Sequence, residues 1–243
     1  MKIDISNYGY AFNYTYFKGF ALITEITSRI YKNAFNVTDL SNISVCFDHS
    51  NNSPCVSQYK TIIYLNCEMG YYCQAAYQLC HELCHIMIKG KVNSKLRWLE
   101  ESICECASLY FMQLISIEWK NQDFFPEYHV NFQKYVQNIL SDTSKIKEFN
   151  ISQLSQENSL VSIYLSNHEY DRDINRYMAI KLLPFFSKNP YLWKAFQNLY
   201  KVVNVDSIIE TLHELKKFDN ANLYSKTIDE ITLFIKSETL IPS

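Results

Sequence analysis

The sequence predicts an α+β fold that is mostly helical. Two short stretches in the first third of the chain, 43–48 (ISVCFD) and 60–66 (KTIIYLN), are rich in β-branched and aromatic residues and predict strands. Two long stretches contain neither proline nor glycine. In 71–89 apolar residues lie nearly all round a helix, and in about 96–119 they lie on one side of it. Together these observations predict a small sheet accompanied by long, largely buried helices.

The remaining segments are assigned in the same way. Aromatic residues occupy every second position over 8–16, which predicts a strand, whereas the spacing of leucine and isoleucine predicts a helix over about 18–34. The C-terminal half is helical in pattern, with breaks near 141–158, 166–171, Pro190 and 219–221. We therefore expect two lobes, residues 1–120 with the sheet and residues 121–243 with helices alone.

Composition and charge argue against a disordered protein and against nucleic-acid or membrane binding. The 243 residues are 48% apolar and 15% aromatic, which is typical of a folded protein. The formal net charge is -2 with no basic stripe, so we expect no nucleic acid and no membrane surface as partner. Asp4, Asn7 and Asn13 interrupt the N-terminal segment, which therefore lacks the apolar core of a signal peptide and predicts a cytoplasmic protein. The sequence gives no indication of oligomeric state.

All eight cysteines lie between Cys46 and Cys106. In a long chain without a signal peptide they are expected to be reduced thiols that serve as small buried apolar residues. The spacing of Cys80 and Cys84 does not fit a zinc ribbon. Because these two cysteines adjoin a histidine pair, a metal-storage or redox-sensing protein remains one alternative function.

The stretch HELCH, residues 81–85, predicts a metal site. His81 and His85 are four positions apart on a predicted helix, so both imidazoles lie on one face and can reach one cation. Glu82 is rotated by about 100° from His81, which lets it reach a water on the metal but not the metal itself. The alternative is a pair of core histidines hydrogen-bonded to their neighbours.

The stretch WLEESICE, residues 98–105, offers a third ligand. Glu101 and Glu105 are one turn apart on the next predicted helix, which a short connection lets pack beside the histidine helix. Glu101 would then point at the histidines, and Glu105 would accept the free N–H of one of them. Glu100 is an alternative ligand, but only Glu101 has an acidic residue four positions later. The plain alternative is a solvated helix face.

HELCH and WLEESICE together resemble the gluzincins, the zinc-metallopeptidase group that includes thermolysin-like and aminopeptidase-N-like enzymes. The resemblance covers about residues 60–112. It implies a zincin-like lobe with a small, mostly antiparallel sheet and an active-site helix, packed on an α-helical C-terminal lobe that closes the cleft. It also implies that strand 61–66 is the edge that pairs with an extended substrate. Aminopeptidase-type members usually have glycine where this chain has Ser102.

The resemblance assigns a role to each site residue. One zinc ion (Zn2+) per chain would be held by His81, His85 and Glu101, with Glu105 bonded to a ligand histidine. Glu82 would be the general base toward a metal-activated water. The predicted function is a zinc-dependent metallopeptidase, of endopeptidase type, acting on a peptide or protein substrate. A second resemblance is to small repressor-cleaving metallopeptidases, whose histidine helix precedes a glutamate- and alanine-rich helix.

The gluzincins also use a tyrosine or histidine that stabilises the oxyanion, and the resemblance places it in the C-terminal lobe. The segment 167–177, NHEYDRDINRY, is the densest polar and aromatic cluster there. Tyr170 is the first choice, followed by His168 and Tyr177, and the alternative is a polar loop that leads into a helix. A non-catalytic regulatory or binding protein on the same scaffold is the main alternative function, although the presence of Glu82 favours an enzyme.

Overall fold

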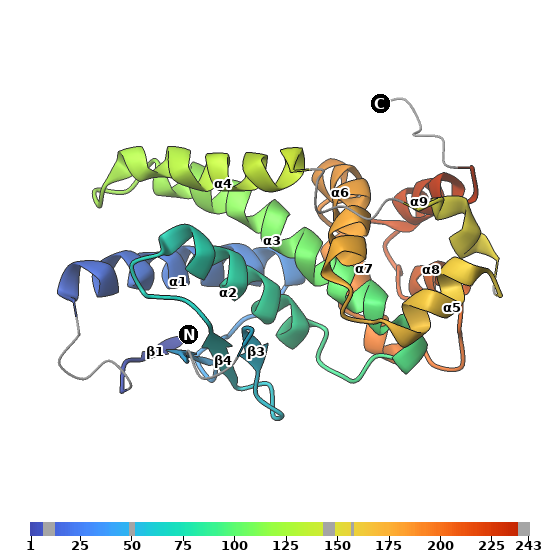
Figure 1. The fold of residues 1–243 in the computed structure, drawn as a ribbon, viewed down its shortest axis with the longest axis horizontal. Helices are drawn as coiled ribbons and strands as arrows, with labels where there is room; N and C mark the ends of the chain where they lie inside the picture. Colours follow the sequence, from blue (N-terminus) through green and yellow to red (C-terminus); the bar gives the residue numbers. More distant parts are fainter. Residues whose placement is uncertain (7–12, 49–51, 143–148, 157, 238–243) are drawn as a thin grey trace. The chain divides into compact units, whose positions relative to one another are not determined.

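A computed structural model describes residues 1–6, 13–48, 52–142, 149–156 and 158–237 (Figure 1). These residues are mostly helical and include one small mixed sheet, which confirms the α+β class. The chain divides into two compact units, Met1–Met87 with Ala107–Asp142, and Ile88–Cys106 with Thr143–Ser243. The expected lobes, 1–120 and 121–243, stay a prediction.

The sheet belongs to the first unit. Within the described residues it has four strands in the order β1-β2-β4-β3: Lys2–Asp4, Ser44–Phe47, Ile62–Leu65 and Cys55–Val56. The pairs β1–β2 and β2–β4 are parallel, and only β3–β4 is antiparallel. The prediction of a mostly antiparallel sheet is therefore wrong. Parallel neighbours need a crossover connection, and helix α1 (Tyr14–Phe35) provides the one between β1 and β2.

The strand predicted at the edge of the sheet, 61–66, is an interior strand. It forms β4, with β2 on one side and β3 on the other. A tight turn folds β3 back onto it, because the Ser57 amide donates to the Ile62 carbonyl (2.8 Å) and the Ser57 hydroxyl accepts from the Ile62 amide (3.0 Å). β3 has only two residues, too few to show strand periodicity in the sequence. The prediction that β4 is the edge for a substrate is wrong.

The predicted strand over 8–16 is also wrong where the structure describes it; residues 7–12 lie outside the described residues. Tyr14 and Tyr16 belong to α1. The Asn13 side chain accepts hydrogen bonds from the amides of Thr15 (2.9 Å) and Tyr16 (3.2 Å) and so caps the helix. This cap outweighs the alternation of aromatic residues as a local signal.

Helices α1 and α2 (Tyr72–Met87) lie side by side over the sheet (Figure 1). They approach closely because Gly19 leaves room for the Tyr72 ring, which a Cβ atom at residue 19 would meet. The Tyr31 hydroxyl donates to the Cys80 carbonyl (2.5 Å) and joins the two helices in the buried core. This packing fixes the helix that carries both histidines.

Two more helices complete the first unit: α3 (Arg97–Trp119), whose first turns belong to the second unit, and α4 (His129–Ser141). The Ser108 hydroxyl on α3 donates to the Tyr77 carbonyl on α2 (3.0 Å). Trp119 is fully buried and packs edge-on against Phe132 of α4, with ring centroids 5.3 Å apart. A side chain of this size contributes about 3 kcal/mol when fully buried.

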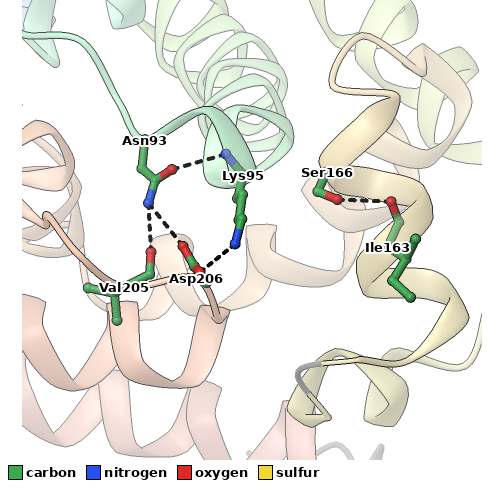
Figure 2. A network of polar contacts seen from close by, with 6 residues as sticks. All are labelled: Asn93, Lys95, Ile163, Ser166, Val205 and Asp206. Carbon is green, nitrogen blue, oxygen red and sulfur yellow. Dashed lines mark hydrogen bonds and ion pairs between the residues drawn. The ribbon is translucent and has the colours of Figure 1, made fainter.

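In the residues described, the second unit contains helices and their connections and no strand. Its principal helices are α5 (Leu160–Asn167), α6 (Arg172–Lys188), α7 (Leu192–Phe196), α8 (Ile208–Lys216) and α9 (Ser225–Ser237). A polar network ties the segment before α3 to the connection between α7 and α8 (Figure 2). There the side-chain Nδ2 of Asn93 donates to the Val205 carbonyl (2.8 Å), and Lys95 pairs with Asp206 (2.5 Å). Across the described ranges, the helices fall short of the length and apolar character needed to cross a bilayer.

Candidate metal centre

The two histidines of HELCH lie one turn apart on α2. Their ring centroids are 5.1 Å apart and their planes meet at 64°. Both side chains are half-buried, whereas Leu83 and Cys84, between them in sequence, are fully buried. Helical geometry thus places both imidazoles on one face and the apolar residues on another.

Glu101 of α3 joins these histidines. One ligand atom from each of His81, His85 and Glu101 can be chosen so that all three lie within 4.8 Å of one another. In the described part of the chain, no other set of three histidine, cysteine or acidic residues forms such a group. The structure therefore brings together the three residues predicted from the sequence as ligands, and metal binding itself stays a prediction.

The donor set fits a catalytic zinc ion. Such a site uses three protein ligands, two of which can be histidine and one glutamate, at about 2.0–2.2 Å, with a fourth position for water. Ligand atoms on a tetrahedron of that size are about 3.4 Å apart. The three ligand atoms of this group lie within 4.8 Å of one another.

Glu82 follows His81 directly but lies in a different environment. Its side chain is buried, with 4% exposure. Its charge reaches Cys55 of β3, because the pKa of that thiol is raised by burial and, next in size, by Glu82. The carboxylate therefore faces the side of α2 that packs on β3 and β4. This position agrees with a residue beside a metal site and outside its set of ligands.

Glu105, one turn after Glu101, is buried and paired with a residue that the sequence reasoning missed. The Arg176 Nε donates to Glu105 Oε1 at 2.9 Å. A buried carboxylate needs a partner, and Arg176 lies in the polar segment 167–177, where the sequence predicts Tyr170 as the functional residue instead. Burial of Glu105 was therefore the signal that could have identified Arg176. The bond from a ligand histidine to Glu105 stays a prediction.

Tyr170 lies in the connection between α5 and α6 and is 62% exposed. Burial raises its pKa, Arg97 lowers it, and the charges of Glu169 and Glu101 raise it, with a net shift upward. Tyr170 is thus close enough to Glu101 to sense its charge. The two alternatives have other contacts: His168 stacks on Tyr164 at 4.0 Å, and Tyr177 is buried against Phe149.

A lysine also supports the end of the histidine helix. The Lys60 ammonium donates to the backbone carbonyl of His85 at 2.7 Å. Lys60 sits in the turn between β3 and β4 with a positive φ of 53°. A cation at a helix C-terminus satisfies a terminal carbonyl and opposes the negative end of the helix dipole. No sequence signal identified this contact, because it depends on how the turn packs on α2.

The cysteines form a structural set. All eight lie in described residues and are free thiols, six of them buried. Burial raises the pKa of Cys46 and of Cys73 to about 11, and of Cys67 to about 12. Thiols with such pKa values are protonated at neutral pH and are therefore poor nucleophiles. The burial of six of them agrees with the prediction that the cysteines serve as small buried apolar residues.

Comparison with protein-family models, with curated proteins and with solved structures found no match for this chain. The gluzincin resemblance, carried by HELCH and WLEESICE, stays a prediction.

Proposed function

We propose that this chain is a zinc-dependent hydrolase that cleaves peptide bonds in a peptide or protein substrate. The observation that carries the proposal is the group of His81, His85 and Glu101, whose ligand atoms lie within 4.8 Å of one another. Buried Glu82 beside this group supports hydrolysis, since a purely structural metal site needs no base there. A zincin-like lobe and a cytoplasmic location belong to the same proposal.

Each residue has a defined task in this proposal. His81, His85 and Glu101 hold the ion, which when bound lowers the pKa of water to about 7 and polarises a carbonyl. Glu82 accepts the proton of the attacking water and delivers it to the nitrogen of the leaving amine. The Tyr170 hydroxyl donates a hydrogen bond to the oxygen that becomes negative in the transition state.

The proposal is tested first by elemental analysis of protein purified without chelator. We expect about one zinc per chain in the parent, and little in His85→Ala and Glu101→Ala. Glu100→Ala is the matched control, because Glu100 is the neighbouring half-buried glutamate and the rival ligand. A parent that stays empty even after zinc is offered would remove the metal site. Retention of zinc by Glu101→Ala together with its loss from Glu100→Ala would transfer the ligand role to Glu100.

A non-catalytic metal protein is the second candidate. It is favoured by the position of β4 inside the sheet, because this strand does not offer a free edge to an extended peptide. Incubation of the zinc-loaded protein with a mixed peptide library, with Glu82→Gln as control, separates the two candidates. Cleavage by the parent that Glu82→Gln lacks supports the enzyme, whereas zinc binding with no cleavage by either protein supports the second candidate.

A further inference from the structure

We propose that Asn175 is a positioning residue that fixes the loop carrying Tyr170 against the helix carrying Glu101. The loop in question, the Tyr170 loop, comprises residues 168–171 between α5 and α6. This inference rests on the proposed function, in which Glu101 is a metal ligand and Tyr170 stabilises the oxyanion. It adds the residues that fix the Tyr170 loop to the segment of α3 that carries Glu101.

Asn175 is a buried amide, 5% exposed, on the first turns of α6. Its Nδ2 donates to the backbone carbonyl of Glu169 at 3.0 Å, immediately before Tyr170. Its Oδ1 accepts from the Ser102 hydroxyl at 3.3 Å, immediately after Glu101. One buried side chain therefore joins the neighbour of Tyr170 to the neighbour of Glu101.

Ser102 has a place in this arrangement that glycine could not fill. The residue is fully buried, and its single hydroxyl hydrogen is shared between the Trp98 carbonyl one turn earlier (2.8 Å) and Asn175 Oδ1 (3.3 Å). Without the hydroxyl, the buried Oδ1 of Asn175 would lose this donor, which costs about 1–3 kcal/mol if no other donor replaces it. The departure from the glycine of aminopeptidase-type gluzincins thus coincides with a contact to α6.

Arg97 provides a second tie between α3 and the Tyr170 loop. Its guanidinium donates to Glu169 Oε1 at 2.8 Å, and both side chains are partly buried. Arg97 precedes Glu101 by one turn of α3, and Ser102 follows Glu101 directly. The side chain and the backbone carbonyl of Glu169 are therefore both fastened to the same stretch of α3, the carbonyl through Asn175.

The far end of the loop is fixed as well. Asp171 caps α6 by accepting from the Ile174 amide (3.4 Å), and its other oxygen accepts from the Tyr164 hydroxyl (2.8 Å). With both flanking residues held, Tyr170 keeps an exposed side chain on a constrained backbone. A group held in this way loses little conformational freedom when it meets a transition state, which favours catalysis.

Hydrogen–deuterium exchange of the whole chain tests the positioning directly, with or without metal. In Asn175→Ala, amides of residues 168–171 should exchange faster by about tenfold or more than in the parent. Ser102→Ala, a milder variant that removes only the hydroxyl, should give a smaller increase at the same amides. Asn189→Ala is the matched control, because Asn189 is a bridging amide at the other end of α6, bonded to the Leu223 carbonyl and to Thr227.

The inference is overturned if the loop amides exchange at the parent rate in both Asn175→Ala and Ser102→Ala, or if Asn189→Ala accelerates them equally.

Kinetic measurements then link the loop to the reaction. Asn175→Ala should retain zinc and lower kcat by about tenfold with little change in KM. In a Tyr170→Phe background it should cause no further loss of kcat. A loop that loosens while kcat is unchanged would overturn the catalytic role of Tyr170. A parent without zinc would overturn the proposed function, and the exchange result would still decide whether Asn175 holds the loop.

Discussion

Glu101 and Asp219 are both carboxylates with polar partners. The partners of Asp219 are close to it in sequence, whereas those of Glu101 lie on another helix. Asp219, 8% exposed in the turn between α8 and α9, accepts from the amides of residues 223, 224 and 225 at 2.6–2.8 Å and from the Ser225 hydroxyl at 2.8 Å. Glu101 is grouped with His81 and His85, which belong to a different helix. One carboxylate organises its own turn, and the other joins a group assembled from distant residues.

The chemistry of the partners separates the two carboxylates further. Amide and hydroxyl donors use up the acceptor capacity of Asp219, and they order the chain at the start of α9. Imidazole nitrogens beside a carboxylate are instead the donor set that divalent metals prefer. Substitutions at the two places should therefore affect different properties: metal content and turnover at the histidine–glutamate group, and the free energy of unfolding at Asp219.

The largest expected effect is on turnover. Glu82→Gln removes the base while keeping size and shape, and should lower kcat by about 10²–10⁴-fold. Zinc content should remain that of the parent, because the proposed ligands are His81, His85 and Glu101. Peptide cleavage assays beside elemental analysis measure both quantities. Unchanged kcat in Glu82→Gln would remove it as the general base, and loss of zinc would make it a ligand.

The next effect is stabilisation by the metal. At a free zinc concentration of 100 to 1,000 times Kd, binding to the folded state alone raises the free energy of unfolding by about 2.7–4.1 kcal/mol. The parent and Asp219→Ala should both gain this amount in thermal or urea unfolding, whereas His81→Ala should gain almost nothing. Equal gains in all three proteins would mean that zinc binds elsewhere on the chain.

Asp219→Ala tests the other side of the comparison. Loss of the capping carboxylate should lower the free energy of unfolding by about 2 kcal/mol, because several donors at the start of α9 lose their acceptor. Asp229→Ala is the control, since Asp229 on α9 is an exposed carboxylate paired with Lys216 at 2.6 Å and should change stability by less than about 1 kcal/mol. Urea unfolding at neutral pH measures both. Similar losses of free energy of unfolding in the two variants would show that the buried cap stabilises the fold no more than an exposed ion pair.

The pH dependence of this cap has a defined sign. Burial raises the pKa of Asp219, but the hydrogen bonds from Tyr224, Ser225 and Leu223 together bring it below its ordinary value. The folded state therefore favours the ionised form, and the stabilisation is present above the ordinary carboxyl pKa of about 3.9. It is lost as the pH falls through the lower pKa of the folded state. The stability difference between parent and Asp219→Asn should be constant above about pH 5 and shrink below about pH 4.

The sequence predicted the helical segments and the ligand group better than the sheet. Helical spacing identified α2 and α3 to within two residues, and the four-residue spacing in HELCH placed both imidazoles on one face. The two-residue β3 is too short to show a period, so the sequence wrongly predicts a sheet edge at the strand beside it. Arg176 and Lys60 escaped detection because their contacts join residues 71 and 25 positions apart. Such pairings depend on packing and leave no periodic pattern in the sequence.

The smallest predicted effect concerns Lys60, which shares one feature with the Asp219 cap and one with the histidine–glutamate group. It is a charged partner of a backbone carbonyl, as in a cap, but the carbonyl belongs to His85. Lys60→Met should lower the free energy of unfolding by about 0.5–1 kcal/mol and weaken zinc binding by less than about tenfold, because α2 loses a hydrogen bond at its last turn while all proposed ligands remain.

Lys95→Met is the matched control. Lys95 forms an exposed ion pair with Asp206 in the second unit, so this change should leave zinc affinity at the parent value. Competition with a chromogenic chelator measures the affinities. If Lys60→Met lost stability with no change in zinc affinity, the contact would be a simple helix cap, and the position of His85 would be set by the packing of α2 alone.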